Sequence, residues 1–156
     1  MTLSRRFDAP VAEVWRAWTD PELVRQWWGP KGFTAPVVEM DVKVAGRSLV
    51  CMEAPEEMGG FRHYNTWTYT HVLPLRQLEF VQHFTDEEGN PIDPSEIGMP
   101  PGIPFEVPHV LTFVDREDST ELTVSEYGYT TPEVVELSRA GMAQCLDKLA
   151  TVIGSD

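Results

Sequence analysis

The side chains that could do chemistry in this 156-residue chain are few and lie far apart. His63 and His71 are eight residues apart on one predicted strand, about 26 Å at the rise of an extended chain, so they cannot share a metal ion. His83 is predicted to face solvent. His71 or His109 could present a polar group to a ligand, although a surface or hydrogen-bonded structural role is the favoured interpretation for each. There is no H-E-x-x-H or comparable spacing, so the sequence predicts no metal site.

Glu126 is the carboxylate with two open interpretations. It shares the parity of Leu122 and Val124 on a predicted strand, which would direct it inward, where desolvation would raise its pKa and suit a general base. Alternatively, it lies near the end of the strand and reaches water, and the usual exposure of glutamate favours this interpretation. No Ser-His-Asp or Cys-His spacing is recognisable, so no catalytic residue is assigned and the sequence leans against an enzyme.

Composition excludes several classes of partner. The chain has 12 Lys and Arg against 25 Asp and Glu, a net charge of -13, which disfavours nucleic acid and anionic membranes. No apolar run is long enough for membrane insertion, and the first residues lack the apolar core of a signal peptide, so we expect a cytoplasmic protein. Cys51 and Cys145 have no C-x-x-C partner and are expected to be buried small hydrophobes.

The length suits a single domain spanning residues 1–156. Apolar spacing and Asp-Pro signals predict two short helices within Pro10–Trp28, with Asp8 capping the first and Asp20 beginning the second. A helix of about 22 residues is expected over 131–153. Period-two patterns joined by short polar turns predict an antiparallel sheet, hence an α+β fold. Its strands are expected at 2–8, 34–44, 47–55, 61–72, 76–86, 109–115 and 121–129.

The segment Glu87–Pro108 does not fit this pattern. It contains six prolines and three glycines, and it is longer than the usual ~12–15 residues of a connection without secondary structure. Its apolar residues could pin it to the body of the domain, so it is interpreted either as an ordered rim loop or as a functional lid.

One face of the 61–72 strand suggests a cavity wall. By parity it carries Trp67, Tyr69 and His71, opposite three threonines, although aromatic side chains also pack in ordinary cores. Gly141 lies within a predicted helix at a cost of about 1 kcal/mol relative to alanine, which suggests a need either for space or for the close approach of another segment. Methionines, predicted inward at 40, 52 and 142, line adaptable apolar pockets. We therefore favour partial lining of a pocket over plain packing.

Several segments, taken in order, resemble one known family. The segments Arg6–Pro10, Val14–Trp15, Ala17–Pro21, Trp27–Pro30 and Gly32–Phe33 resemble the opening of the bacterial AHSA1-like proteins of the START/Bet v 1-like (SRPBCC) superfamily. The segments Asp41–Gly46, Leu73–Pro74 and Gly141–Leu149 agree in order and spacing. Departures occur at Ala45, Leu75 and Met142, where the family often has glycine, proline and tryptophan.

This resemblance implies a helix-grip fold, in which a curved sheet of six or seven strands and a C-terminal helix enclose a hydrophobic cavity. The expected function is binding of a hydrophobic or aromatic small molecule, without a cofactor, and a homodimer is possible. One alternative is a cyclase- or hydrolase-type enzyme using Glu126 or His71 as acid or base. The other is an interaction module like the Hsp90 activator. The expected ligand-binding residues are Trp28, Met40, Met52, Trp67, Tyr69, His71, Phe80, Val124, Glu126 and Met142.

Overall fold

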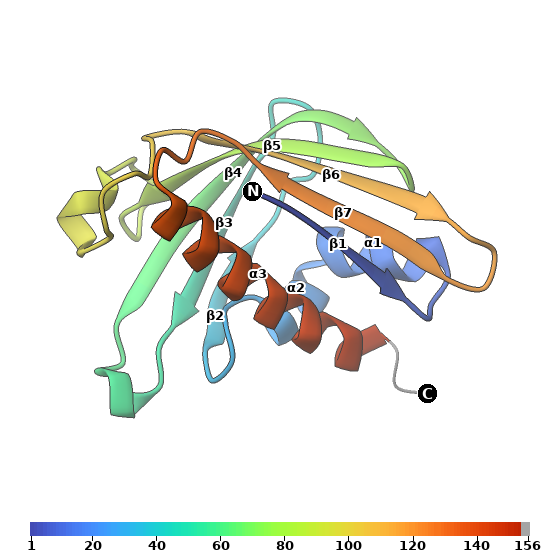
Figure 1. Ribbon diagram of the computed structural model, residues 1–156, viewed down its shortest axis with the longest axis horizontal. Helices are drawn as coiled ribbons and strands as arrows, with labels where there is room; N and C mark the ends of the chain where they lie inside the picture. The colour runs from blue at the N-terminus through green and yellow to red at the C-terminus, as the bar shows by residue number, and fades with distance from the viewer. Residues whose placement is uncertain (154–156) are drawn as a thin grey trace.

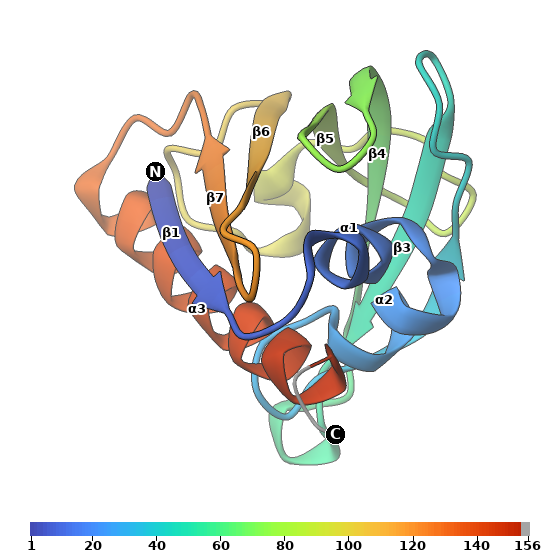
Figure 2. The ribbon, with the colours of Figure 1, turned by 90° about the vertical axis from the view of Figure 1, so that its right-hand side faces the viewer.

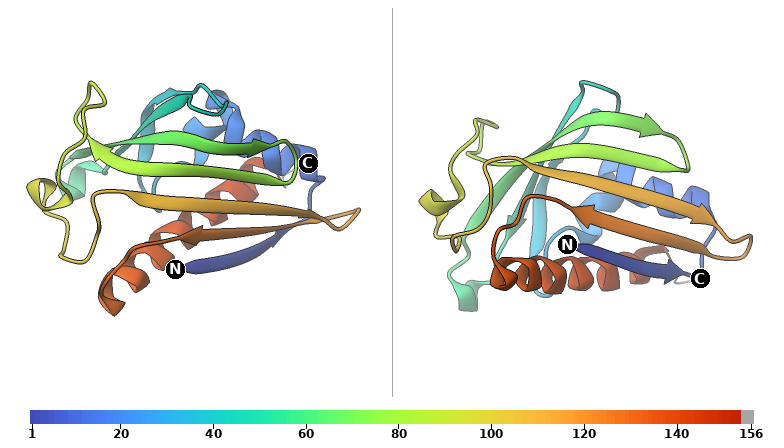
Figure 3. Two further views of the ribbon diagram at one scale, coloured as in Figure 1. Left: turned by 90° about the horizontal axis from the view of Figure 1, so that it is seen from above. Right: turned by 45° about the horizontal axis from the view of Figure 1, so that its top comes forward.

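A computed structural model describes residues 1–153 and shows one antiparallel sheet with three helices (Figure 1). The strand order is β1-β7-β6-β5-β4-β3-β2. Figure 3 shows α3 crossing beneath the concave side of the sheet. This confirms the predicted α+β helix-grip fold. The elements are β1 (Thr2–Phe7), α1 (Val11–Thr19), α2 (Pro21–Trp27), β2 (Thr34–Glu39), β3 (Arg47–Glu53), β4 (Arg62–Leu73), β5 (Gln77–Thr85), β6 (Val107–Asp115), β7 (Thr120–Glu126) and α3 (Pro132–Ile153).

The two short helices begin where proline stands near an acidic residue. Asp20 caps α2, because its side chain accepts a hydrogen bond from the Glu22 N–H at 3.0 Å. The expected cap at Asp8 is wrong, since Pro10 occupies the cap position of α1 and no side chain caps that helix. The buried face of α1 carries Val14 and Trp18 as the spacing predicted.

The second strand is shorter than its alternating pattern suggested. β2 ends at Glu39, and the chain then turns, with the Gly46 N–H donating to the Lys43 carbonyl at 2.7 Å. A Cβ at position 46 would lie 2.3 Å from the Asp41 carbonyl oxygen, so this turn needs glycine there. Val44 is 61% exposed, so the alternation beyond residue 39 belongs to a loop and not to a half-buried strand.

The inner face of the sheet divides into two halves. In the packed half, the inward side chains Trp67, Tyr69, Leu78, Phe80 and Leu111 are fully buried in the core that α1 and α2 help to form. Trp18 of α1 joins the two layers, with ring centroids 4.5 Å from Trp27 and 6.0 Å from Trp67. Figure 2 shows α1 and α2 side by side, away from the first turns of α3.

The open half lies at the other end of the same strands. Its inward side chains are His63 and Asn65 on β4 and Gln82 and Phe84 on β5. The first four turns of α3 lie across from them. No helix of residues 1–153 is long and apolar enough to cross a membrane.

The proline-rich segment is an ordered loop that contains a short 3₁₀ turn, Pro94–Ile97. Asp93 and Glu96 form a reciprocal capping box at its start. The Ile92 N–H donates to the Phe84 carbonyl at 2.9 Å, and the Thr130 N–H donates to the Gly102 carbonyl at 3.0 Å. The loop is therefore attached both to the end of β5 and to the connection between β7 and α3.

Candidate ligand-binding pocket

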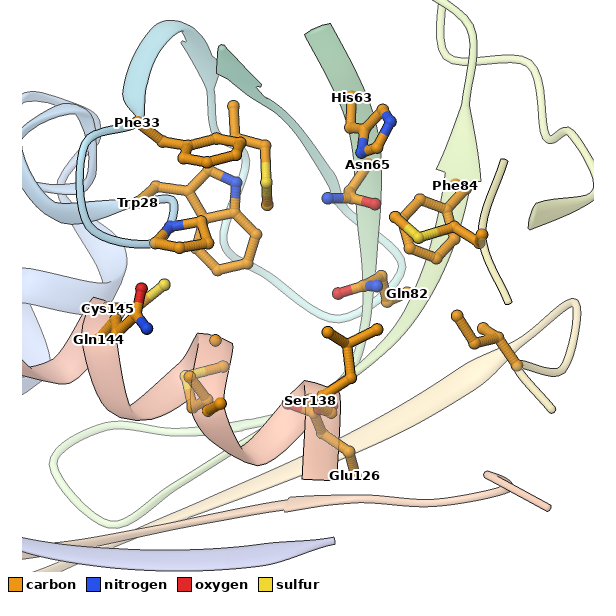
Figure 4. A pocket seen from close by; sticks show the side chains of 18 of the residues that line it. Trp28, Phe33, His63, Asn65, Gln82, Phe84, Glu126, Ser138, Gln144 and Cys145 are labelled. Carbon is orange, nitrogen blue, oxygen red and sulfur yellow. The ribbon is translucent and has the colours of Figure 1, made fainter. Parts of the chain in front are cut away.

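A pocket of about 590 Å³ lies between the open half of the sheet and the first four turns of α3 (Figure 4). Most of its lining is apolar or aromatic, as is usual for small-molecule sites. Exposed residues of the lining, among them Lys31, Met58 and Leu137, mark its opening to solvent. The apolar side chains of the lining are Trp28, Pro30, Phe33, Met52, Met58, Phe61, Phe84, Met99, Ile103, Val134, Leu137, Ala140, Met142 and Cys145.

The α3 wall of the pocket leaves open space because it carries a glycine. Ser138, Gly141, Met142 and Cys145 follow one another on the face of the helix toward the pocket. A Cβ placed on Gly141 would meet no atom within 4 Å. Gly141 therefore borders the open space of the pocket, and no neighbouring segment approaches it closely.

The connection from α2 to β2 forms a second wall. Trp27 packs in the core, and its indole N–H donates to the Ala17 carbonyl at 2.8 Å, whereas Trp28 lines the pocket. Lys148 of α3 holds this connection in place, because its ammonium donates to the carbonyls of Gly29 and Phe33, each at 3.0 Å. Burial lowers the pKa of Lys148. Gly29 has φ +101°, and a Cβ there would lie 2.9 Å from that of Phe33.

Four polar side chains cross the sheet where its two halves meet, and we call them the polar row: Asn65, Gln82, His109 and Glu126. The strand register places Gln82 one diagonal step from Asn65, His109 one further diagonal step away, and Glu126 directly opposite His109. All four are more than nine-tenths buried, and all four line the pocket. The row gives a mostly apolar pocket a polar floor.

Glu126 is 4% exposed and is surrounded by hydrogen-bond donors. Its Oε1 accepts from the hydroxyls of Tyr129 and Ser138, and its Oε2 lies 3.5 Å from the Nε2 of His109. Burial opposes ionisation, but His109, Ser138 and Tyr129 together outweigh it, so the pKa of Glu126 lies below its ordinary value of 4.5. The favoured interpretation, that Glu126 reaches water, is therefore wrong. The inward interpretation is correct in position but wrong in expecting a raised pKa.

His109 is fixed by its neighbours. Its Nδ1 lies 3.0 Å from the Val107 carbonyl, which can only accept, so Nδ1 carries a proton and Nε2 is the nitrogen toward Glu126. The ring stacks on Phe80, with centroids 4.7 Å apart and planes 19° apart. Burial and the nearby carboxylate raise the pKa of Tyr129, which therefore remains a donor to Glu126.

The structure brings four of the ten expected ligand-binding residues into the pocket lining: Trp28, Met52, Glu126 and Met142. Four others, Trp67, Tyr69, Phe80 and Val124, point inward but are fully buried in the core outside that lining. Met40 follows the end of β2 and packs half-buried against the core.

His71 is exposed, so the expectation that it shares the inward face is wrong. The pairing of β4 with β5 shifts register between Tyr69 and His71. An extra residue at such a bulge reverses the alternation that follows it. Alternation counted from Trp67 therefore assigns the wrong face to His71, only four residues further along the strand. The exposed position of His71 gives no support to the acid–base role considered for it.

Several residues of the pocket were not predicted to line it. His63 and Asn65 share the parity of Trp67, and Gln82 and Phe84 share that of Phe80, so counting backward along β4 and onward along β5 would have found them. Met99 and Ile103 come from the proline-rich loop, which therefore forms part of the rim of the pocket. Burial lowers the pKa of His63.

Neither cysteine has the features of a reactive thiol. Both are free and buried, and burial raises the pKa of Cys145 to about 12, which suppresses the thiolate. Among residues 1–153, no group of three or more His, Cys, Asp or Glu side chains is placed to hold a metal ion.

A curved antiparallel sheet over a long C-terminal helix, with a pocket between them, defines a ligand-binding type of domain. The sequence model of one family, described as activator of Hsp90 ATPase homolog 1-like protein, matches residues 8–154. The chain belongs to this AHSA1-like family, as the N-terminal segments indicated.

Solved structures agree on the fold. A protein of Arthrobacter aurescens is 25% identical, with a TM-score of 0.78 over 99% of this chain and 86% of that one. A Chromobacterium violaceum protein is 23% identical, with a TM-score of 0.78 over 100% and 98% of the two chains. An AHSA1 protein of Silicibacter pomeroyi is 20% identical, with a TM-score of 0.76 over 97% and 94%. No curated protein matches the sequence.

Proposed function

We propose that the protein binds a hydrophobic or aromatic small molecule in the pocket between the open half of the sheet and α3. The observation that carries this proposal is a pocket of about 590 Å³ whose lining is mostly apolar, in a domain whose remaining inner face is closely packed. Removing apolar ligand surface from water provides the driving force, at about 25 cal/mol per Å². Location in the cytoplasm and a homodimer stay predictions from the sequence.

Two features support the proposal that the pocket binds a ligand. Gly141 keeps the helix wall clear at the expense of helix propensity, which a domain selected only for stability would not need. The aromatic rings of Trp28 and Phe33, in the α2–β2 connection, and of Phe84, on β5, all line the same pocket, where they offer flat surfaces to an aromatic ligand.

Filling the pocket tests the proposal. Gly141→Phe directs a benzyl group into the open space, and Glu136→Phe places the same group on the solvent side of α3, where the native side chain is 74% exposed. Fluorescence titration with pyrene should show saturable binding to the wild type and to Glu136→Phe, and at least tenfold weaker binding to Gly141→Phe. Equal binding by the two variants, or no binding of pyrene or hexadecanol by the wild type, would overturn the proposal.

A second candidate is a cyclase- or hydrolase-type enzyme that uses the same pocket. The observation that favours it is the buried carboxylate of Glu126 beside His109, at the end of the polar row. An ionised, sequestered carboxylate can accept a proton from a bound substrate. Turnover of a substrate found by binding, with loss of turnover in Glu126→Gln, would support this candidate, and unchanged turnover would exclude the role of Glu126.

A further inference from the structure

The hydrogen-bonding capacity of Glu126 is only partly used. Its Oε1 already accepts two hydroxyl donors. Its Oε2 faces the Nε2 of His109 at 3.5 Å, which is beyond the usual 2.7–2.9 Å of a charge-assisted hydrogen bond. His109 cannot approach by simple rotation, because its ring is held by Phe80 and by the Val107 carbonyl. Oε2 of Glu126 and Nε2 of His109 therefore lie side by side at the pocket without a short hydrogen bond between them.

The rest of the polar row gives independent evidence for a polar partner. Gln82 is 8% exposed and lines the pocket, and its amide makes no hydrogen bond to any residue of 1–153. The Oδ1 of Asn65 is likewise buried with no partner in that part of the chain. Figure 4 shows the Gln82 amide directed into the pocket. A buried polar atom without a partner, such as the Oδ1 of Asn65, is costly, and a ligand with polar groups on one edge would satisfy it and would also bind the Gln82 amide.

We propose that Glu126 and His109 form the seat of a ligand hydroxyl, so that the pocket selects neutral, hydroxyl-bearing apolar molecules. The hydroxyl donates to Oε2 of Glu126 and lies within reach of Nε2 of His109. Because its one proton is given to Oε2, the hydroxyl oxygen can in turn accept a hydrogen bond from Nε2 of a protonated His109 ring. This inference rests on the proposed function, since it names the class of molecule that enters the same pocket.

The same geometry disfavours anionic ligands at this end of the pocket. A fatty-acid carboxylate beside Glu126 would bring two like charges together where little water screens them. Lys31, the one lysine or arginine of the described lining, is exposed at the mouth. An anionic amphiphile would therefore have to bind with its head outward, leaving the polar row unsatisfied.

A matched series of pyrenes separates these cases. We would titrate the wild type at pH 7 with 1-hydroxypyrene, 1-methoxypyrene and pyrene-1-carboxylate, and follow pyrene fluorescence. The first two probes differ mainly in the donated proton, so the wild type should bind the hydroxyl compound at least tenfold more tightly, as expected for a hydrogen bond to a charged acceptor.

Two isosteric variants locate the effect. Glu126→Gln should bring the ratio of hydroxyl to methoxy affinity toward one. Glu121→Gln, on the same strand but pairing outward with Arg116, should leave this ratio unchanged. Thermal unfolding checks that each variant is folded. If Glu126→Gln does not fold, the ratio of hydroxyl to methoxy affinity in the wild type decides whether a ligand hydroxyl is bound.

The outcomes are distinguishable. Equal, tight binding of the hydroxyl and methoxy compounds by the wild type would overturn the hydroxyl seat and leave the proposed function standing. Tightest binding of pyrene-1-carboxylate would also overturn it, and would indicate an amphiphile with its head at Lys31. Absence of binding of all three probes would contradict the proposed function together with the inference.

Discussion

The packed half and the open half of the sheet lie on the same strands and on the same face. Trp67 and Asn65 are two residues apart on β4, and both are almost wholly buried, yet one contacts three aromatic rings and the other lines a pocket. The difference comes from what covers each half. Side chains of α1 and α2 pack closely over one end, whereas α3 presents Gly141 and Ser138 to the other.

The comparison teaches that stability and binding are separated along the strands. Aromatic stacking runs from Trp67 through Phe80 to His109, at centroid distances of 4.8 and 4.7 Å. It ends at the polar row, where the Gln82 amide and the Oδ1 of Asn65 lack partners within the described chain. Substitutions in the packed half should therefore change mainly the free energy of unfolding, and those in the open half mainly ligand affinity.

The largest effect on stability is expected in the packed half. Trp67→Ala removes a fully buried indole and should lower the free energy of unfolding by about 3–5 kcal/mol. Phe84→Ala, in the open half, removes a half-buried ring and should cost about 1–2 kcal/mol while weakening pyrene binding. Urea denaturation followed by circular dichroism measures both. Equal costs for the two variants would show that the open half is as closely packed as the other.

An intermediate effect is expected where α3 holds the α2–β2 connection. Lys148→Met leaves the carbonyls of Gly29 and Phe33 without their ammonium donor and should cost about 1–3 kcal/mol in unfolding free energy. Pyrene affinity should fall as well, because Trp28 and Phe33 lie at the two ends of this connection. Lys43→Met, at a site 72% exposed, is the control and should cost less than about 0.5 kcal/mol. Equal costs would mean that the contact of Lys148 with these carbonyls does not stabilise the fold.

The smallest effect concerns pH. Because the pKa of Glu126 is lower in the folded chain than its ordinary 4.5, its carboxylate stabilises the fold at neutral pH, and this contribution is lost as the pH falls through and below that value. Hydrogen bonds also lower the pKa of Asp86 and Asp93, so the wild type alone is not diagnostic.

The measurement is therefore a difference between variants. Urea denaturation between pH 3 and 7 should give a flatter acid limb for Glu126→Gln than for the wild type, and an unchanged limb for Glu121→Gln. Parallel profiles for all three proteins would contradict the assignment of a depressed pKa to Glu126.

Much of the fold could be predicted because the signals are local. Period-3.6 spacing predicted α1, α2 and α3, and alternation predicted all seven strands, because these patterns follow from backbone geometry within a few residues. The pattern failed where a local feature interrupts it. β2 ends before Val42 because the chain turns at Gly46, and His71 faces outward because of the register change after Tyr69.

The sequence by itself predicted the inward face of most strands, a ligand-binding role for Trp28, a need for space or close approach at Gly141, and which family the chain resembles. Only the tertiary structure decided which end of that face is filled, so Trp67 and Phe80 became core while Gln82 and Phe84 became pocket. It also decided that Glu126 is buried and ionised, through partners on β6 and α3. The physical reason is that alternation reports the side of a strand, whereas burial at each point along it depends on segments far away in the chain.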